Sequence, residues 1–299
     1  MTTHLSPGRG AVYPGFLDAH VHLALIDPVM LPSGGIARVL DLGGWLPDGP
    51  RPSMPDLAYA HQFVTVPGGY PSRADWAEPA WTCAVSGAAD AAGAVDLQAA
   101  AGASVLKITL NSEAGPVLGG EALLALVGRA HHRGLPVVAH AEGAGEAERA
   151  FSAGVDAFAH TPFSERLGDD LVNAMAGRMT WISTLDIHGW GSRTAAFEIA
   201  SDNLRRFHGS GGRVLYGTDL GNGPLRLGLN LREIVALLGA GLTPDDVLAA
   251  LCSSAPLGLT VADTRVTFVP GERPRDPGAF ADWLVTARAL TRPELEELA

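Results

Sequence analysis

The chain has 299 residues, of which 47% are hydrophobic and 18% are charged, and its formal net charge at pH 7 is −11. The apolar fraction is large enough for a sizeable core and excludes a disordered chain. The acidic charge argues against nucleic acid as a partner, because a phosphate backbone would be repelled.

Eight short apolar runs, several of them containing β-branched or aromatic residues, are typical of buried parallel strands. They span residues 15–19, 37–42, 62–66, 104–110, 135–139, 157–159, 180–185 and 213–217. Most of the gaps between them can hold a helix. Helical patterns are predicted at 121–133, 145–153, 171–176, 195–207, 231–238 and 245–251.

Eight strands with interleaved helices predict a closed (β/α)₈ TIM barrel, with a doubly wound sheet as the alternative. Residues 24–55 are rich in Pro and Gly, so the first two crossovers are expected to be loops in part. We expect an N-terminal extension at 1–13, the barrel at 14–260 and a C-terminal appendage at 261–299. Within the appendage, FADWLV at 280–285 could form one more strand.

No run of about 18 apolar residues is present to cross a membrane, and MTTHLSPGRG lacks the apolar core of a signal peptide. The two cysteines, Cys83 and Cys252, lie far apart and do not suggest a disulfide framework. We therefore expect a cytoplasmic protein that acts on a small molecule, without nucleic acid or membrane as a partner. Homo-oligomer formation stays open.

The first predicted strand ends in His20-Val21-His22. Residues i and i+2 of a strand point to the same face, so the two imidazoles should project side by side. That arrangement suits two nitrogen ligands of one divalent cation, zinc above all. Taken alone, the motif is a weak signal, since histidine pairs are common on surface strands.

Residues of the kind that bind metals or move protons occur at the ends of four predicted strands and within a fifth, on the barrel rim where the catalytic groups of such barrels lie. These residues are His20, His22, Lys107, His140, His160 and Asp219. Weaker candidates for substrate contacts, for which an ordinary loop role is equally open, are Tyr70, Ser72, Asn111, Glu113, Glu142, His188, Trp190 and Asn222.

The motifs PGFLDAHVHL, VLKITL, PVVAHAEG, GVDAFAHTP and VLYGTD occur in this order between Pro14 and about Leu259. This ordered set resembles the amidohydrolase superfamily of metal-dependent hydrolases, and within it the imidazolonepropionase-like and prolidase-like members. The order of the motifs is far more specific than any one of them.

The resemblance implies one or two divalent metal ions. In a binuclear centre, His20 and His22 would bind the more buried cation, and His140 and His160 the second. Lys107 would bridge the two as a carbamate formed with carbon dioxide. A carbamate has two anionic oxygens, whereas a lysine ammonium has no lone pair.

The same resemblance implies that Asp219 contacts the first cation and shuttles protons. Three alternatives remain open. Lys107 could be an ordinary lysine at the rim of a mononuclear site, His160 could stabilise the transition state, and Asp219 could be a helix cap.

The function that follows is hydrolysis of a carbon–nitrogen bond in an amide, lactam, cyclic imide or short peptide, by attack of a metal-bound hydroxide. The reverse cyclisation is possible on the same site. A lactonase, esterase or phosphotriesterase is the alternative reaction, and a catalytically silent metal-binding barrel that acts as a binding protein is the alternative of another class. Many relatives carry a β-sandwich built from both termini. The dozen residues before the first strand are expected to be too few for its N-terminal half, so the C-terminal appendage is expected to be a reduced sandwich remnant.

Overall fold

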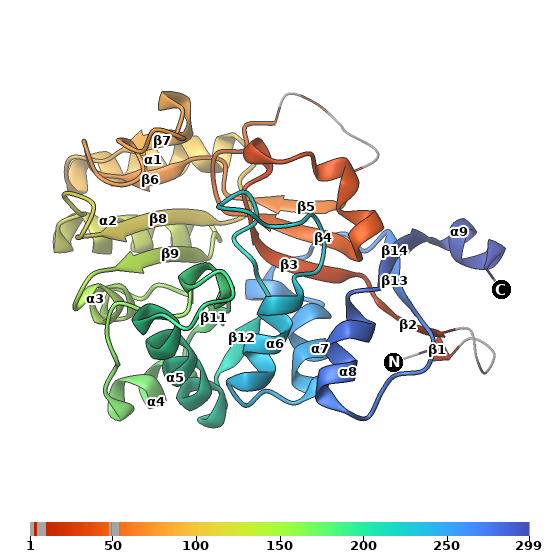
Figure 1. The fold of residues 1–299 in the computed structure, drawn as a ribbon. Helices are drawn as coiled ribbons and strands as arrows, with labels where there is room; N and C mark the ends of the chain where they lie inside the picture. Colours follow the sequence, from red (N-terminus) through yellow and green to blue (C-terminus); the bar gives the residue numbers. More distant parts are fainter. Residues whose placement is uncertain (1–2, 5–9, 48, 50–53, 299) are drawn as a thin grey trace.

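The computed structural model describes residues 3–4, 10–47, 49 and 54–298. Over these residues the chain has an α/β fold with a seven-stranded parallel sheet, a three-stranded parallel sheet and a four-stranded antiparallel sheet (Figure 1). The larger sheet has the order β12 (Arg213–Leu215), β11 (Thr180–Ile182), β10 (Ala157–Phe158), β9 (Val137–Glu142), β8 (Leu106–Asn111), β6 (Phe63–Thr65) and β7 (Thr82–Ala84). The smaller parallel sheet has the order β3 (Phe16–Val21), β4 (Ile36–Asp41) and β5 (Asp56–Tyr59). The predicted α/β class is therefore confirmed.

Backbone hydrogen bonds connect the first strand of the chain with the segment that follows β12. The amide of Ala19 donates to the carbonyl of Tyr216 at 2.9 Å, and the amide of His22 donates to the carbonyl of Leu220 at 2.7 Å. These bonds bring the carboxyl end of β3, with its two histidines, next to the segment that carries Asp219.

The third predicted strand, expected at 62–66, is β6, and a further strand, β5, precedes it in the smaller parallel sheet. They are separated at His61, whose φ is +68°. The amide of Ser104 donates to the carbonyl of Tyr59 at 2.8 Å, so β5 also contacts the start of the strand that carries Lys107. The apolar pattern did not locate β5, because this strand is partly exposed.

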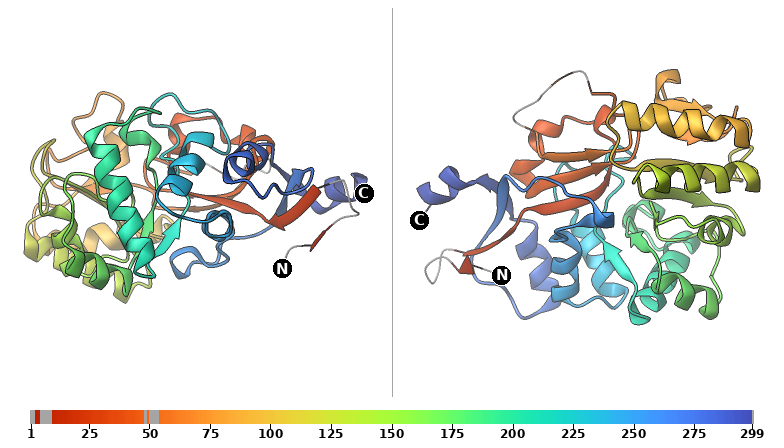
Figure 2. Two further views of the ribbon diagram at one scale, coloured as in Figure 1. Left: turned by 60° about the horizontal axis from the view of Figure 1, so that its bottom comes forward. Right: turned by 180° about the vertical axis from the view of Figure 1, so that it is seen from behind.

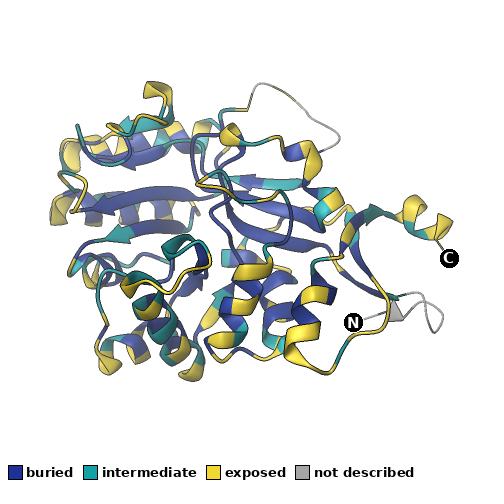
Figure 3. Ribbon diagram, in the orientation of Figure 1, coloured by how far each residue is buried: buried dark blue, intermediate teal, exposed yellow. Residues whose placement is uncertain are grey.

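Helices pack outside the parallel strands, with their apolar faces inward and their exposed residues outward (Figure 3). They are α1 (Ala88–Ala100), α2 (Gly120–His132), α3 (Glu146–Ser152), α4 (Asp169–Ala176), α5 (Ala195–Gly209), α6 (Leu231–Gly239) and α7 (Pro244–Leu251). Three short 3₁₀ turns, η1 (Leu23–Leu25), η2 (Pro28–Met30) and η3 (Pro32–Gly34), stand between β3 and β4, where the Pro- and Gly-rich sequence predicted loops. Within the described residues, no helix is both long enough and apolar enough to cross a membrane.

The buried apolar residues form an inner and an outer cluster. The outer cluster fills the space between strands and helices, where Trp181 and Phe207 stack with ring centroids 3.9 Å apart. The inner cluster takes side chains from strands of both parallel sheets: Leu17, Leu40, Ala58, Val138, Ala157, Ile182 and Leu215. Burial of the Leu, Ile and Val side chains among them contributes about 1.5–3 kcal/mol each to folding.

Both chain ends contribute to the antiparallel sheet, of order β1 (Thr3–His4), β2 (Gly10–Pro14), β13 (Arg265–Pro270) and β14 (Arg288–Thr291). The residues before the first predicted strand take part in this sheet, since β2 pairs with β13 along its whole length. Figure 2 shows the two termini at the same end of the molecule.

The prediction of a strand in FADWLV is wrong, because this segment lies in helix α8 (Pro277–Leu284). The side chain of Asp276 accepts a hydrogen bond from the amide of Ala279 at 2.8 Å, and Pro277 occupies the first helical position. This capping favours a helix start, and burial of Phe280 and Trp283 then holds the helix on the body of the protein. Helix α9 (Arg292–Glu297) follows β14.

Candidate metal centre and its cavity

The two histidines of the HVH motif are buried at the end of β3. The Nδ1 atom of His20 lies 2.8 Å from the carbonyl oxygen of Ala159, and Nδ1 of His22 lies 2.9 Å from that of Gly43. A carbonyl can only accept, so each Nδ1 carries a proton, and because burial lowers the pKa of His20, the Nε2 of that residue presents a lone pair. Backbone carbonyls that fix the tautomer in this way are a regular feature of metal-binding histidines.

Both Nε2 atoms face the carboxylate of Asp219, which follows β12. Oδ1 of Asp219 lies 3.1 Å from Nε2 of His20 and 3.1 Å from Nε2 of His22. Nevertheless, Nε2 of His20 makes no hydrogen bond to any of the described residues, although it is fully buried. An unpaired lone pair beside a buried carboxylate is the arrangement expected where a cation binds, because such a group is otherwise costly to bury.

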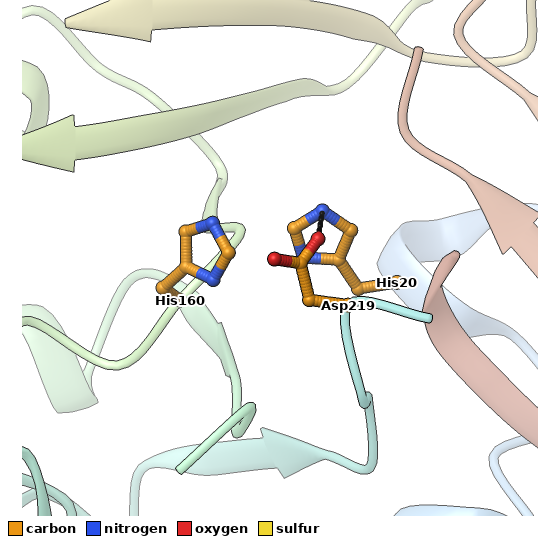
Figure 4. A group of neighbouring side chains, drawn as sticks. All are labelled: His20, His160 and Asp219. Carbon is orange, nitrogen blue, oxygen red and sulfur yellow. Dashed lines mark ion pairs between the residues drawn. The ribbon is translucent and has the colours of Figure 1, made fainter. Parts of the chain in front are cut away.

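His160 completes a group of three with His20 and Asp219. One potential ligand atom from each of the three lies within 4.8 Å of the others. Figure 4 shows the imidazole of His160 across from Asp219 and His20, whose ion pair is drawn as a dashed line. The ring of His160 is also 4.9 Å from that of His140, measured between centroids, so it lies between the two halves of the site.

The charges of this group depend on one another. Burial lowers the pKa of both His20 and His160 well below the ordinary value. Burial alone would raise the pKa of Asp219, but His20 and His22 outweigh it and hold this pKa well below the ordinary value. At neutral pH, Asp219 is therefore an ionised carboxylate among imidazoles, of which His20 and His160 are neutral. Neutral imidazole and carboxylate are the forms that bind a cation.

Lys107, on β8, lines the same cavity and is only 2% exposed. Burial lowers the pKa of its amine to about 7, against the opposing attraction of Asp219 and Asp41. A substantial fraction of the side chain is then uncharged near neutral pH. The uncharged amine is the form that has a lone pair.

His140, at the end of β9, is engaged by a carboxylate. Its Nε2 lies 2.9 Å from Oε2 of Glu142, which also accepts a hydrogen bond from Nδ2 of Asn111 at 2.7 Å. His140 does not belong to the close group of three around Asp219. In this arrangement Glu142 orients His140, and Asn111 orients Glu142.

Two buried aspartates, which the sequence reasoning missed, hold the metal-facing segments in place. Oδ1 of Asp18 accepts from the amides of His20 and Thr218, both at 3.1 Å, and Oδ2 accepts from the Thr218 hydroxyl at 2.5 Å. Asp18 thus connects the HVH strand to the residue before Asp219, 200 positions away. Asp41 accepts from the amides of Leu23 at 2.7 Å and Gly43 at 3.0 Å. The only signal in the sequence was a polar residue inside each apolar strand.

Backbone strain is concentrated at two residues of the site. Asp219 has a φ of +57° and Thr184 a φ of +44°. Positive φ is tolerated by Asp but costly for a β-branched residue such as Thr. The hydroxyl of Thr184 lies 2.9 Å from Nδ1 of His160, so this strain places a hydrogen-bond partner for one of the candidate ligands.

The strand-end residues surround a cavity of ≈ 410 Å³. His20, His22, Lys107, His140, His160 and Asp219 all line it, and so do four of the weaker candidates, Tyr70, Glu142, His188 and Asn222. The other four do not: Asn111 lies behind Glu142, the hydroxyl of Ser72 donates to the carbonyl of Gly69, and neither Glu113 nor Trp190 is part of the lining. The sequence reasoning missed the lining residues Leu25, Phe63, Trp76, Thr109, Phe163, Ile187, Gly221 and Gly223.

The fold and the position of this cavity, at the carboxyl ends of parallel strands, define the class as an α/β protein with a histidine-rich site of the kind found in metal-dependent enzymes. No family model and no curated protein matches the sequence. Solved structures do match, and they confirm the resemblance to the amidohydrolase superfamily at the level of the fold.

One similar structure is a Xaa-Pro dipeptidase with bound methionine in its active site, at a TM-score of 0.73 and 19% identity, covering 94% of this chain and 85% of that one. Another is an amidohydrolase, at a TM-score of 0.68 and 22% identity, with 91% and 82% covered. A third is the ochratoxinase of A. niger, at a TM-score of 0.74 and 15% identity, with 94% and 82% covered.

Proposed function

We propose that this chain is a metal-dependent hydrolase that cleaves a carbon–nitrogen bond in a small molecule, such as an amide, a lactam, a cyclic imide or a short peptide. The observation that carries the proposal is the buried group of His20, His160 and Asp219 at the wall of the cavity, with an unpaired imidazole nitrogen aimed at the carboxylate. The similarity in fold to a dipeptidase and to other hydrolases supports it.

The donor set fits a divalent cation. His20, His22 and Asp219 would hold it, and His160 is close enough to join them. Imidazole nitrogens with one carboxylate are typical zinc ligands, so we propose zinc. A divalent cation bound there would lower the pKa of water and polarise a substrate carbonyl.

We further propose that the centre is binuclear and that Lys107 carries a carbamate. The depressed pKa of Lys107 supports this, because only an uncharged amine can add to carbon dioxide. His140 and His160 would then serve the second cation. For this, Nε2 of His140 would have to leave Glu142 or share it.

Asp219 has the chemistry of the proton carrier. It is ionised at neutral pH, it is buried among the imidazoles, and Nδ2 of Asn222 donates to its Oδ2 at 2.8 Å. A carboxylate in this position can accept a proton from the attacking water and return it to the leaving nitrogen. The hydrogen bond from Asn222 orients it for both transfers.

The two parallel sheets support a closed (β/α)₈ barrel, which we propose as the architecture of residues 14–260, flanked by segments 1–13 and 261–299. The backbone bonds between β3 and the segment after β12, and the inner cluster shared by seven strands of both sheets, support closure. The C-terminal segment, paired with β2, would be a reduced sandwich remnant.

We propose that the protein is located in the cytoplasm.

Metal analysis and a hydrolase panel test the proposal together. Protein purified without chelators should contain one or two zinc ions per chain by elemental analysis, and it should hydrolyse a member of an amide and imide panel. Activity confined to lactones, esters or phosphotriesters would replace the carbon–nitrogen reaction by the alternative one. A bound metal without turnover of any panel member would indicate a binding protein, and a folded protein without metal would refute the site.

A further inference from the structure

Aromatic and aliphatic side chains make up much of the cavity wall away from the candidate ligands. One group, from β6 and the loop after it, consists of Phe63, Tyr70 and Trp76. The Trp76 ring is 6.1 Å from that of Phe63 and 6.2 Å from that of Tyr70, both edge-to-face. Tyr70 in turn stacks on His140 at 5.1 Å. These rings form a continuous surface that reaches the candidate second metal ligand.

A second group follows β10 and β11. Phe163 lies 4.1 Å from the ring of His188 and 6.5 Å from that of His160, measured between centroids. Ile187 lines the cavity beside His188. Substrate bound at the metal centre would therefore contact rings from two separate segments.

Two apolar side chains of the lining remain open to solvent. Trp76 is 40% exposed and Leu25 is 36% exposed, although both are large and hydrophobic. Exposure of such residues at the mouth of a cavity costs hydrophobic free energy unless a ligand covers them. Both are available for a bound molecule.

Apart from the proposed cation, the described residues of the cavity lining offer an anionic group of the substrate no exposed cationic side chain. Among the described residues that line the cavity there is no arginine, and the only lysine is the buried Lys107. Glu142 lines the same wall and would repel a carboxylate.

We propose that the substrate is a neutral amide with an aromatic or bulky alkyl group and no free carboxylate, and that Trp76, Phe63 and Phe163 bind this group. The inference rests on the proposed function for the reacting bond, while the choice of substituent rests on the cavity wall. A substrate without a free carboxylate distinguishes this chain from an enzyme for free dipeptides, because such an enzyme would need a cationic partner for the terminal carboxylate.

Three ligands of similar shape test the proposal on the metal-loaded protein: acetanilide, 4-acetamidobenzamide and the anion 4-acetamidobenzoate. Binding is measured by calorimetry, and hydrolysis by chromatography of the released amine. We expect both neutral compounds to bind at least about ten-fold more tightly than the anion, and Trp76→Ala to weaken their binding about ten-fold through the lost ring contact. Leu124→Ala removes an exposed apolar side chain on α2, outside the cavity, and should change nothing.

Equal or tighter binding of the benzoate, unchanged binding after Trp76→Ala, or no binding of either neutral compound would overturn the inference. A preference for the neutral ligands without hydrolysis would support the inference while counting against the proposed reaction. Binding and turnover therefore separate the two proposals.

Discussion

Glu233, on helix α6, offers a quantitative test of the packing behind the site. Its side chain is fully buried, and Oε2 accepts a hydrogen bond from the amide of Asp186 at 2.8 Å. Oε1 has no hydrogen-bond partner in the part of the chain that the structure describes. Because Asp186 begins the η5 turn (Asp186–His188) that carries His188 to the cavity, Glu233 connects the helix layer to the site.

Burial raises the pKa of Glu233 from 4.5 to about 7, against the opposing effect of its hydrogen bonds. The folded state then keeps a proton that the unfolded chain releases. The stabilisation from this proton is complete below pH 4.5 and is lost as the pH rises through 7. At about 1.36 kcal/mol per pKa unit, the loss between pH 5 and pH 8 is about 2–3 kcal/mol.

Glu233→Gln removes the titration and keeps an oxygen for the Asp186 amide. Burial also raises the pKa of Asp18 to about 7 and that of Asp41 to about 6, so wild-type stability should fall over this range for several reasons. The difference between wild type and variant isolates Glu233. Urea unfolding should show that the wild type loses about 2–3 kcal/mol more than the variant between pH 5 and pH 8.

The exposed Glu148 on α3 supplies the matched control, since Glu148→Gln should leave the pH dependence unchanged. Parallel curves for the wild type and Glu233→Gln, within about 0.5 kcal/mol, would refute the reasoning. They would mean that Glu233 is already ionised in the folded protein at pH 5.

Three further changes address the site itself. Asp219→Asn cannot hold a proton, so kcat on a confirmed substrate should fall about 10²–10⁴-fold, while elemental analysis should show a smaller loss of metal; near-normal kcat would remove Asp219 from the reaction. Lys107→Ala should lower the metal content from two ions to one or fewer and abolish the activity, and added bicarbonate should not restore it. If the variant keeps two metal ions and the wild-type rate, Lys107 is an ordinary residue of the rim. Asp18→Ala breaks the hydrogen bonds to His20 and Thr218 and should reduce the free energy of unfolding by about 2–4 kcal/mol. Thr218→Val should reduce the free energy of unfolding by about 1 kcal/mol. Equal losses in the two variants would contradict the bridging role of Asp18.

The sequence by itself located most of the parallel strands, though not β5 or β7, and the polar residues at or near their ends. His20 and His22 share a face because strand residues alternate with period two. The groups after successive parallel strands meet at one edge, because all the strands point the same way. Local pattern was sufficient here, since each inference needed only one strand and its direction.

Only the tertiary structure decided which of these groups meet. His160 joins His20 and Asp219, whereas His140 turns to Glu142, and no spacing in the chain distinguishes these two outcomes. The bond between Asp18 and Thr218 closes a separation of 200 residues and leaves no periodic signal.

The substrate-facing wall and the terminal segments depended on the same kind of long-range packing. Trp76 and Phe163 lie in irregular loops, where side-chain direction follows from neighbours rather than from a repeat. FADWLV lies in a helix because Asp276 and Pro277 cap the start of that helix and because Phe280 and Trp283 are buried against the rest of the protein. Hydrophobic content alone does not choose between strand and helix in so short a segment, so the surrounding fold made that choice.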